Sequence, residues 1–477
     1  MLKKKIWIFI GLFVIVFIVG GGLLLYSWGV FATSFKKANN DTLVTKQQTL
    51  PIPPLLEDKN PAPNKAEFEI TARDGTMEFF EGTITNTRGY NGNFLGPVIR
   101  VRTGEEVSVK VTNELDESTT LHWHGLEVDG ENDGGPHNEI KPGETWNPMF
   151  TINQPAATLW YHPHQMHKTG KQVYEGMAGL FYIEDEVSDS LKIPKEYGVN
   201  DVPLIIQDRR FDGDGQLDYE LGMKDSIVGF EGHTILVNGA VNPFVEAPQG
   251  MMRLRILNGS NGRIYNLKFS NGQEFYQIAS DGGFLEKPVR MDSLTVGSGE
   301  RAEILVDFSK VAMGETVELQ DQGISFMSFV VNQASDKVYS IPEKLTTIEK
   351  IDERKATTKR EFNFQGTGSS VSINGVQMDM DRIDEEVNLG STEIWEVGNF
   401  TGQTHPFHAH GVQFQILDRN GNPPPDNEAG WKDTFLVKPG ENVRVIATFK
   451  HEGIFMYHCH ILEHEDAGMM GQFLVEP

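Results

Sequence analysis

The stretch Lys438-Pro439-Gly440-Glu441-Asn442-Val443-Arg444-Val445-Ile446-Ala447 joins a Pro-Gly turn to a run in which apolar side chains recur at about every second position. This alternation is typical of a β-strand with one face in a core. The turn recurs as Lys141-Pro142-Gly143-Glu144 and, without the proline, as Ser298-Gly299-Glu300-Arg301. Three such turns at equivalent places predict a β-sandwich that occurs three times in the chain.

Alternating strand patterns and glycine-rich turns fill the same three blocks, and the 477 residues include 49 glycines and 23 prolines. We therefore expect an all-β protein with three domains, at residues 66–190, 200–338 and 361–477. Residues 36–65 and 339–360 are predicted linkers. The five prolines between Pro51 and Pro63 favour an extended, poorly packed tether in the first of these linkers.

The first 35 residues have the composition of a membrane-targeting segment. Three lysines, Lys3 to Lys5, precede a stretch from Ile6 to Phe35 that contains no charged residue. Its apolar part is long enough to span the membrane, which favours an uncleaved anchor in the cytoplasmic membrane. A signal peptide cleaved after Val30-Phe31-Ala32 is the alternative. Both interpretations predict an extracytoplasmic protein, either membrane-anchored or secreted.

Charge and cysteine content exclude two further classes. The formal net charge is −25, and the only basic block lies at the extreme N-terminus, so nucleic acid is not an expected partner. Cys459 is the only cysteine in the chain, which excludes an intrachain disulfide framework.

Ten of the fourteen histidines fall into four short clusters: His122-Trp123-His124, His162-Pro163-His164, His405-Pro406-Phe407-His408-Ala409-His410, and His458-Cys459-His460 with His464. In a strand, residues i and i+2 share a face, so each His-x-His pair places two imidazoles on one side. Four pairs supply eight imidazoles, half from the first block and half from the third. We therefore expect one metal cluster between these blocks, with the middle block as a spacer.

Cys459 predicts a second metal centre, because its side chain points away from those of its two histidine neighbours on a strand. It can join His405, His464 and Met469 on the opposite face. A thiolate with two imidazoles and a weak thioether is the ligand set of a blue-copper site, whereas zinc gains nothing from a distant thioether. Copper is therefore the metal predicted for both centres.

With these motifs, residues from about Glu67 to Pro477 resemble a bacterial multicopper oxidase of the laccase type, which is built from three cupredoxin domains. The resemblance implies four coppers per chain: one type 1, one type 2 and two type 3. By position, it implies His405, Cys459, His464 and Met469 as type 1 ligands, His122 and His408 as type 2 ligands, and His124, His162, His164, His410, His458 and His460 as type 3 ligands.

The function that the resemblance implies is oxidation of a reductant, one electron at a time, coupled to reduction of dioxygen to two waters. Phenols and aromatic amines are the expected reductants. The alternative is a metal-ion oxidase for Cu(I), Fe(II) or Mn(II) that serves copper or metal tolerance, which the acidic composition favours weakly. Similar cuprous oxidases carry an Asp and a Met shortly before the first type 1 histidine, and residues 398–404 lack both.

Two further possibilities follow from the same resemblance. Copper-free relatives serve as structural proteins in cell division, but this chain keeps every ligand. Asp133 and Glu465 match positions that carry proton-relay acids in the resembling enzymes, and dioxygen reduction consumes protons that neutral imidazoles do not supply. We therefore expect Cys459, Asp133 and Glu465 to take part in catalysis.

Overall fold

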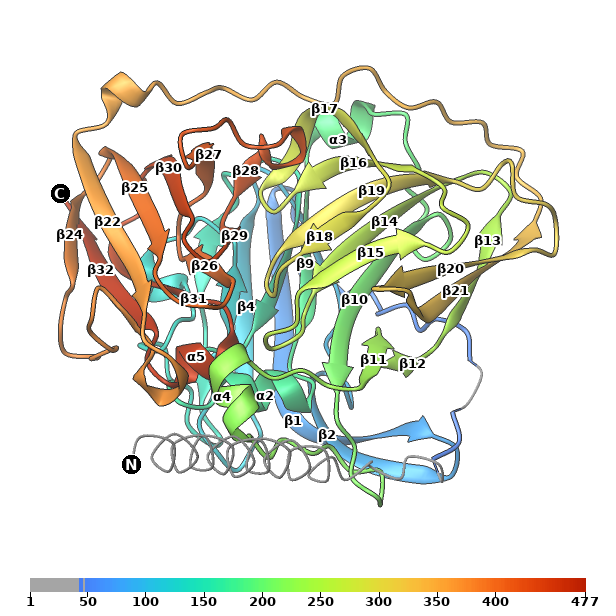
Figure 1. Cartoon of the computed structure of the whole chain (residues 1–477), viewed down its shortest axis with the longest axis horizontal. Coiled ribbons are helices and arrows are strands. Elements are labelled where there is room, and N and C mark those ends of the chain that lie inside the picture. Colours follow the sequence, from blue (N-terminus) through green and yellow to red (C-terminus); the bar gives the residue numbers. More distant parts are fainter. Residues whose placement is uncertain (1–42, 46–47) are drawn as a thin grey trace, which may run out of the picture. The chain divides into compact units, whose positions relative to one another are not determined.

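Strands form almost all of the regular structure, and they build six sheets (Figure 1). The computed structural model describes residues 43–45 and 48–477. The predicted membrane-targeting segment, residues 1–35, lies outside the described residues and stays a prediction. Within the described part, no helix is both long and apolar enough to cross a membrane.

Two sheets make up the first block. The first has the order β2-β1-β4-β6, with β7 also pairing with β4, and the second has the order β3-β9-β8-β5. Their strands are β1 (Lys65–Phe80), β2 (Thr83–Tyr90), β3 (Ile99–Arg102), β4 (Glu106–Asn113), β5 (His122–His124), β6 (Thr145–Trp146), β7 (Met149–Thr151), β8 (Ala157–His162) and β9 (Gly179–Glu184).

The middle block again has two sheets, ordered β12-β11-β10-β14-β19-β16-β17 and β13-β21-β20-β15-β18. Their strands are β10 (Asp201–Arg209), β11 (Thr234–Val237), β12 (Ala240–Val241), β13 (Phe244–Pro248), β14 (Met251–Asn258), β15 (Tyr265–Phe269), β16 (Phe275–Ser280), β17 (Gly283–Met291), β18 (Leu294–Val296), β19 (Arg301–Asp307), β20 (Thr316–Asp321) and β21 (Ile324–Gln333).

The third block contains sheets ordered β23-β22-β25-β30-β27-β28 and β24-β32-β31-β26-β29. Their strands are β22 (Thr358–Gln365), β23 (Ser372–Ile373), β24 (Glu385–Asn388), β25 (Thr392–Asn399), β26 (His405–Ala409), β27 (Phe414–Arg419), β28 (Trp431–Lys432), β29 (Thr434–Val437), β30 (Asn442–Thr448), β31 (Gly453–Cys459) and β32 (Met470–Glu476).

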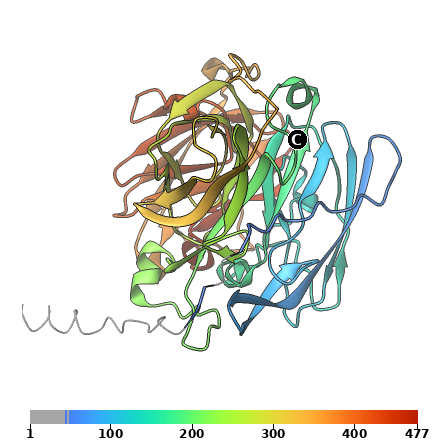
Figure 2. The same ribbon diagram turned by 90° about the vertical axis from the view of Figure 1, so that its right-hand side faces the viewer.

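The three blocks share one pattern of strand pairing. In the first sheet of each, a parallel pair joins β1 to β4, β10 to β14 and β22 to β25. In the second sheet, parallel pairs join β3 to β9, β13 to β21 and β24 to β32. Three large apolar clusters each draw on both sheets of one block. The described chain is therefore a triplicated β-sandwich, as predicted, and the blocks appear as separate colour groups in Figures 1 and 2.

Helices are few and short, and several lie beside the ends of strands that carry histidines. They are α2 (Thr169–Glu175), α3 (Glu186–Ser190), α4 (Met223–Val228), α5 (Leu462–Asp466) and the 3-10 turns η2 (Gly130–Asn132), η3 (Glu353–Lys355), η4 (Gly368–Ser370) and η5 (Asp426–Glu428). Helix α5 carries His464, and both α2 and α4 contact it. Helix α4 belongs to the middle block, so that block reaches the end of the third block where His464 lies.

Residues 36–42 and 46–47 of the first predicted linker lie outside the described residues. The described parts of both linkers are extended, but they are packed more closely than their composition predicts. The Leu50 N–H donates to the Phe244 carbonyl of the middle block, and the Leu56 N–H donates to the Val98 carbonyl of the first. In the second linker, Leu345 and Ile348 are buried. Apolar residues at these positions bind the linkers to the sandwiches, although the prolines exclude regular strands. The exact domain boundaries stay predictions.

Candidate metal centres

All eight histidines of the predicted cluster are buried and lie together between the first and third blocks. Within each block, strand pairing places one histidine pair opposite the other. His122 on β5 lies opposite His162 on β8, and His408 on β26 lies opposite His458 on β31. Each remaining histidine of the four pairs is two residues further along the chain. Alternation puts His122 and His124 on one face of β5, as the spacing predicted, whereas His164, His410 and His460 lie just beyond the ends of β8, β26 and β31.

Stacked imidazoles join the two blocks. The ring of His122 stacks on that of His410, and the ring of His124 stacks on that of His408, each with centroids 3.7 Å apart. In both stacks one ring belongs to the first block and the other to the third. The cluster therefore exists only where these blocks meet.

Hydrogen bonds fix which nitrogen of several rings carries the proton. The Nδ1 atoms of His122 and His408 donate to the backbone carbonyls of Asp133 and Asp433, at 3.0 and 2.9 Å. Their Nε2 atoms are buried without any hydrogen-bond partner. A buried unpaired nitrogen costs about 1–3 kcal/mol, so it needs a ligand to compensate.

Other ring nitrogens face one another, and between His410 and His458 neither nitrogen carries the proton. His458 Nε2 lies 3.2 Å from the Nε2 atoms of both His164 and His410. The Nδ1 atom of His410 is 2.8 Å from an Asp133 carboxylate oxygen, which places the His410 proton on Nδ1. His458 Nδ1 likewise donates to the Cys459 carbonyl. The lone pairs of His410 Nε2 and His458 Nε2 thus face each other, with His164 Nε2 close by, and a metal cation fits between them.

Burial keeps these imidazoles in the neutral form that binds metals. It lowers the pKa values of His124, His162, His408 and His410 well below the ordinary value, and those of His164 and His460 to about 3. Neighbouring imidazoles reinforce the effect in each ring, because two positive charges would repel at this distance. These six rings are therefore neutral at ordinary pH.

The second predicted centre lies on the opposite face of β31. The Cys459 sulfur is 3.3 Å from His405 Nδ1 and 3.8 Å from His464 Nδ1, and all three residues are buried. Met469 is also buried and lies beside Cys459, whose N–H donates to the Met469 carbonyl. The structure therefore brings together the four residues of the predicted blue-copper set.

Burial also raises the pKa of the Cys459 thiol, since a thiolate is costly in an apolar site. A metal cation reverses this preference, because a coordinating thiol loses its proton. The donor set of thiolate, two imidazoles and thioether fits copper in particular.

Asp133 and Glu465, the two predicted relay acids, are buried and lie against different histidines of the cluster. Glu465 Oε2 is 3.2 Å from His458 Nδ1, and Oε1 is 3.5 Å from His164 Nδ1. Burial would raise the pKa of Glu465, but His164 and His458 outweigh burial and lower it to about 2. Asp133 contacts His410 and His122.

The middle block is more than a spacer, which corrects the expectation from the sequence. Arg301 at the start of β19 forms a buried ion pair with Asp433, and Asp433 accepts a hydrogen bond of 3.0 Å from His124 Nε2. Sequence reasoning missed both residues, because neither lies near a histidine in the chain. A signal was present in the repeated turn: Arg301 follows Gly-Glu where the other blocks have Thr145 and Asn442.

Comparison with known proteins agrees with the interpretation of the eight histidines and the set around Cys459 as metal ligands. Sequence profiles described as multicopper oxidase match residues 71–188 and 341–477. The multicopper oxidase mco of Staphylococcus haemolyticus is 42% identical over 89% of this chain and 91% of its own length. The chain belongs to the multicopper oxidase family. It is therefore an oxidoreductase that uses dioxygen as its electron acceptor, and copper is the metal that the family implies.

Solved structures and other relatives of this multicopper oxidase support the same family. The laccase from Pediococcus acidilactici superposes with a TM-score of 0.87 and 42% identity, covering 91% of this chain and 94% of that protein. The cell division protein FtsP of Escherichia coli is 37% identical over 91% of this chain and 93% of its own length. Because proteins with different names share this fold, the reductant has to be argued from the site itself.

Replacing Cys459 with Ser tests the second centre. The variant is expected to lose the blue absorption, because the thiolate is its source, and to lose reductant oxidation. Copper held by the eight histidines should remain, since their lone pairs are unchanged. Visible absorption and copper content per chain are the measurements, and blue colour that survives the substitution would contradict the assignment.

A substitution at Gly134 tests whether the loop that carries Asp133 holds His122 in place. It has φ +81°, and a Cβ there would lie 1.8 Å from the Leu121 carbonyl oxygen. We expect Gly134→Ala to displace the Asp133 carbonyl from His122 and to lower copper content. Gly143→Ala is the matched control, because Gly143 has φ +77° with open space around it. Gly143→Ala should lower the free energy of unfolding only by the cost of the left-handed backbone, about 1–2 kcal/mol. Equal copper content in both variants would show that the loop does not hold His122.

Proposed function

We propose that this multicopper oxidase oxidises small organic reductants, such as phenols and aromatic amines, and reduces dioxygen to water. The observation that carries the proposal is the position of Cys459. Its sulfur belongs to one donor set, whereas its chain neighbour His458 belongs to the other, and the ring of its other neighbour His460 lies against those of His124 and His162. Bound copper would supply one-electron chemistry at the first set and dioxygen reduction at the second.

The proposed ligand assignment follows the two donor sets. Type 1 copper is assigned to His405, Cys459, His464 and Met469. Type 2 copper is assigned to His122 and His408, and the type 3 pair to His124, His162, His164, His410, His458 and His460. This gives four coppers per chain. The pairs of facing, unprotonated nitrogens support the assignment.

The reductant is proposed to approach His464. Its Nε2 atom points away from Cys459 and has no hydrogen-bond partner among the described residues. Burial lowers the pKa of His464 to about 4, and the carbonyls of Ile227 and Ser226 on α4 oppose this shift from nearby. Leu221 and Met223, at the start of this helix, are exposed apolar side chains. Exposed apolar side chains at one end of the helix that packs against α5, which carries His464, suit an aromatic reductant.

A comparison of reductants by oxygen uptake tests this proposal. We expect larger kcat/KM values for a phenol and an aromatic diamine than for Cu(I) or Fe(II), because residues 398–404 offer no acid or thioether to a cation. Larger values for either metal ion would contradict the proposal for organic reductants and favour the second candidate.

A metal-ion oxidase is the second candidate, and one segment favours it. The Met378 N–H donates to the Gly468 carbonyl, so Met378-Asp379-Met380-Asp381 lies beside the loop that carries Met469. Thioethers and carboxylates in one segment suit a soft or divalent cation. Met378→Leu with Met380→Leu would then slow metal-ion oxidation but not phenol oxidation. Met313→Leu, at an exposed methionine between β19 and β20, is the matched control.

Asp133 and Glu465 are proposed to deliver protons to the histidine cluster. Each acid has carboxylate oxygens against ring nitrogens of two cluster histidines. An ionised carboxylate in this position can take a proton from water and pass it on.

Asp133→Asn and Glu465→Gln test the relay, since the amides keep the shape but cannot carry the proton. Reoxidation of the fully reduced enzyme by dioxygen should slow on the order of 100-fold, with copper content and blue colour retained. Asp116→Asn, at an exposed carboxylate, is the control and should reoxidise at the wild-type rate. Wild-type rates in both relay variants, measured by stopped flow across the working pH range, would rule out the assignment.

An extracytoplasmic location is also proposed, with the protein membrane-anchored or secreted. It rests on the lysines and the uncharged stretch of residues 1–35. Binding to the cytoplasmic membrane through this segment is part of the same proposal.

A further inference from the structure

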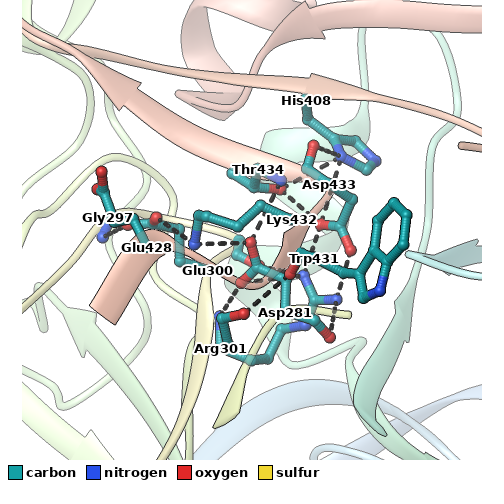
Figure 3. Close-up of polar contacts among 12 residues, drawn as sticks. Asp281, Gly297, Glu300, Arg301, His408, Glu428, Trp431, Lys432, Asp433 and Thr434 are labelled. Atoms are coloured by element: carbon teal, nitrogen blue, oxygen red, sulfur yellow. Dashed lines mark hydrogen bonds and ion pairs between the residues drawn. The ribbon is translucent and has the colours of Figure 1, made fainter. Parts of the chain in front are cut away.

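Arg301 is a completely buried arginine at the point where all three blocks meet (Figure 3). Two of its N–H groups donate to the two carboxylate oxygens of Asp433, at 2.7 and 2.6 Å. The others donate to the carbonyls of Thr158, Gly299 and Asp281, at 3.1 to 3.2 Å. All five donors of the guanidinium are therefore used, with acceptors from the first, middle and third blocks.

Asp433 is held from several sides, and one of its oxygens serves the histidine cluster. Oδ2 accepts from Arg301 and from Gln413 Nε2 at 2.7 Å. Oδ1 accepts from Arg301, from Thr434 Oγ1 at 2.9 Å and from His124 Nε2 at 3.0 Å. Because the Arg301 guanidinium donates to both of its oxygens, the Asp433 carboxylate is the acceptor in its remaining contacts.

The contact to Asp433 therefore places the proton of His124 on Nε2 and leaves Nδ1 with a lone pair. His124 Nδ1 lies 3.4 Å from His162 Nε2, and the other nitrogen of His162 donates to the Pro163 carbonyl. His408, which stacks on His124, has the opposite arrangement, because its Nδ1 donates to the Asp433 backbone carbonyl. Asp433 thus sets the ring orientation of two stacked histidines in opposite senses.

We propose that Arg301 of the middle block is a positioning residue for the histidine cluster: it holds the Asp433 carboxylate where His124 must bind metal through Nδ1. This inference rests on the proposed copper cluster and adds a role for the middle block. The planar guanidinium holds both carboxylate oxygens at once, which a lysine ammonium cannot do. The fit is tight, since a Cβ on Gly125 would lie 2.6 Å from the guanidinium.

The surrounding charges make Asp433 dependent on Arg301 in particular. Lys432, the next residue in the chain, is also buried, but it pairs with Asp281 and Glu300 at 2.9 and 3.0 Å (Figure 3). Lys432 therefore forms its ion pairs with carboxylates other than that of Asp433. Among the described residues, Arg301 is the one lysine or arginine that forms an ion pair with Asp433.

Arg301→Lys is the test, with copper affinity and spectra as the readouts. We expect copper affinity of the histidine cluster to fall about 10-fold, the lower end of the loss that is usual when the hydrogen-bond partner of a ligating histidine is disturbed. The near-ultraviolet absorption of the coupled copper pair should weaken. The blue absorption of the Cys459 centre should persist, because Arg301 makes no contact with that centre.

Arg255→Lys is the matched control. Arg255 lies on β14, which pairs with β19, and it is also buried and also binds a carboxylate through two nitrogens, that of Asp201. It contacts no histidine. Full copper affinity in Arg301→Lys, or an equal loss in both variants, would overturn the inference. No copper at the histidine cluster of the wild-type protein would instead overturn the proposed function.

A measurement on the copper-free wild-type protein keeps the inference testable if Arg301→Lys does not fold. Nitrogen-15 NMR of labelled histidines, with His124 identified from the signal missing in His124→Gln, reports which ring nitrogen carries the proton. We expect the proton on Nε2. A proton on Nδ1 would show that Asp433 does not set the orientation of this ring.

Discussion

Imidazole nitrogens that face each other without a proton between them, as in His410 and His458, are the constraint on which the rest of the structure depends. His458 Nε2 lies 3.2 Å from two other Nε2 atoms, and the protons of His410 and His458 are directed outward, to Asp133 and to the Cys459 carbonyl. Such lone pairs repel unless a cation lies between them. The neighbouring carboxylates and carbonyls hold the rings in this arrangement. A copper ion bound between the facing nitrogens would remove the repulsion between their lone pairs.

Each block contributes to this arrangement in a different way. The first and third blocks provide the stacked rings, and the chain at Cys459 connects the two donor sets through single residues. The middle block provides Arg301 on one side and α4 beside His464 on the other. The proposed paths of electrons and protons, and the hydrogen bonds that orient the rings, therefore involve separate groups around one interface between sandwiches.

Local patterns in the sequence predicted the fold and the grouping of the candidate ligands, because turns, alternation and His-x-His spacing act over a few residues. The eight histidines and the set around Cys459 lie together as that spacing predicted. The residues that hydrogen-bond to these ligands could not be predicted from local patterns. Arg301 and Asp433 are 132 residues apart, and only tertiary packing brings them together. The orientation of His124 depends on that contact, and the packing of the linkers depends on distant strands in the same way.

Anomalous diffraction at the copper absorption edge, from crystals of copper-loaded protein, tests the central claim most directly. The account predicts one copper peak among Cys459, His405 and His464, and a separate group of peaks within the cage of eight histidines, with one peak bound by Nδ1 of His124. The absence of peaks between the first and third blocks in fully loaded protein would contradict the account.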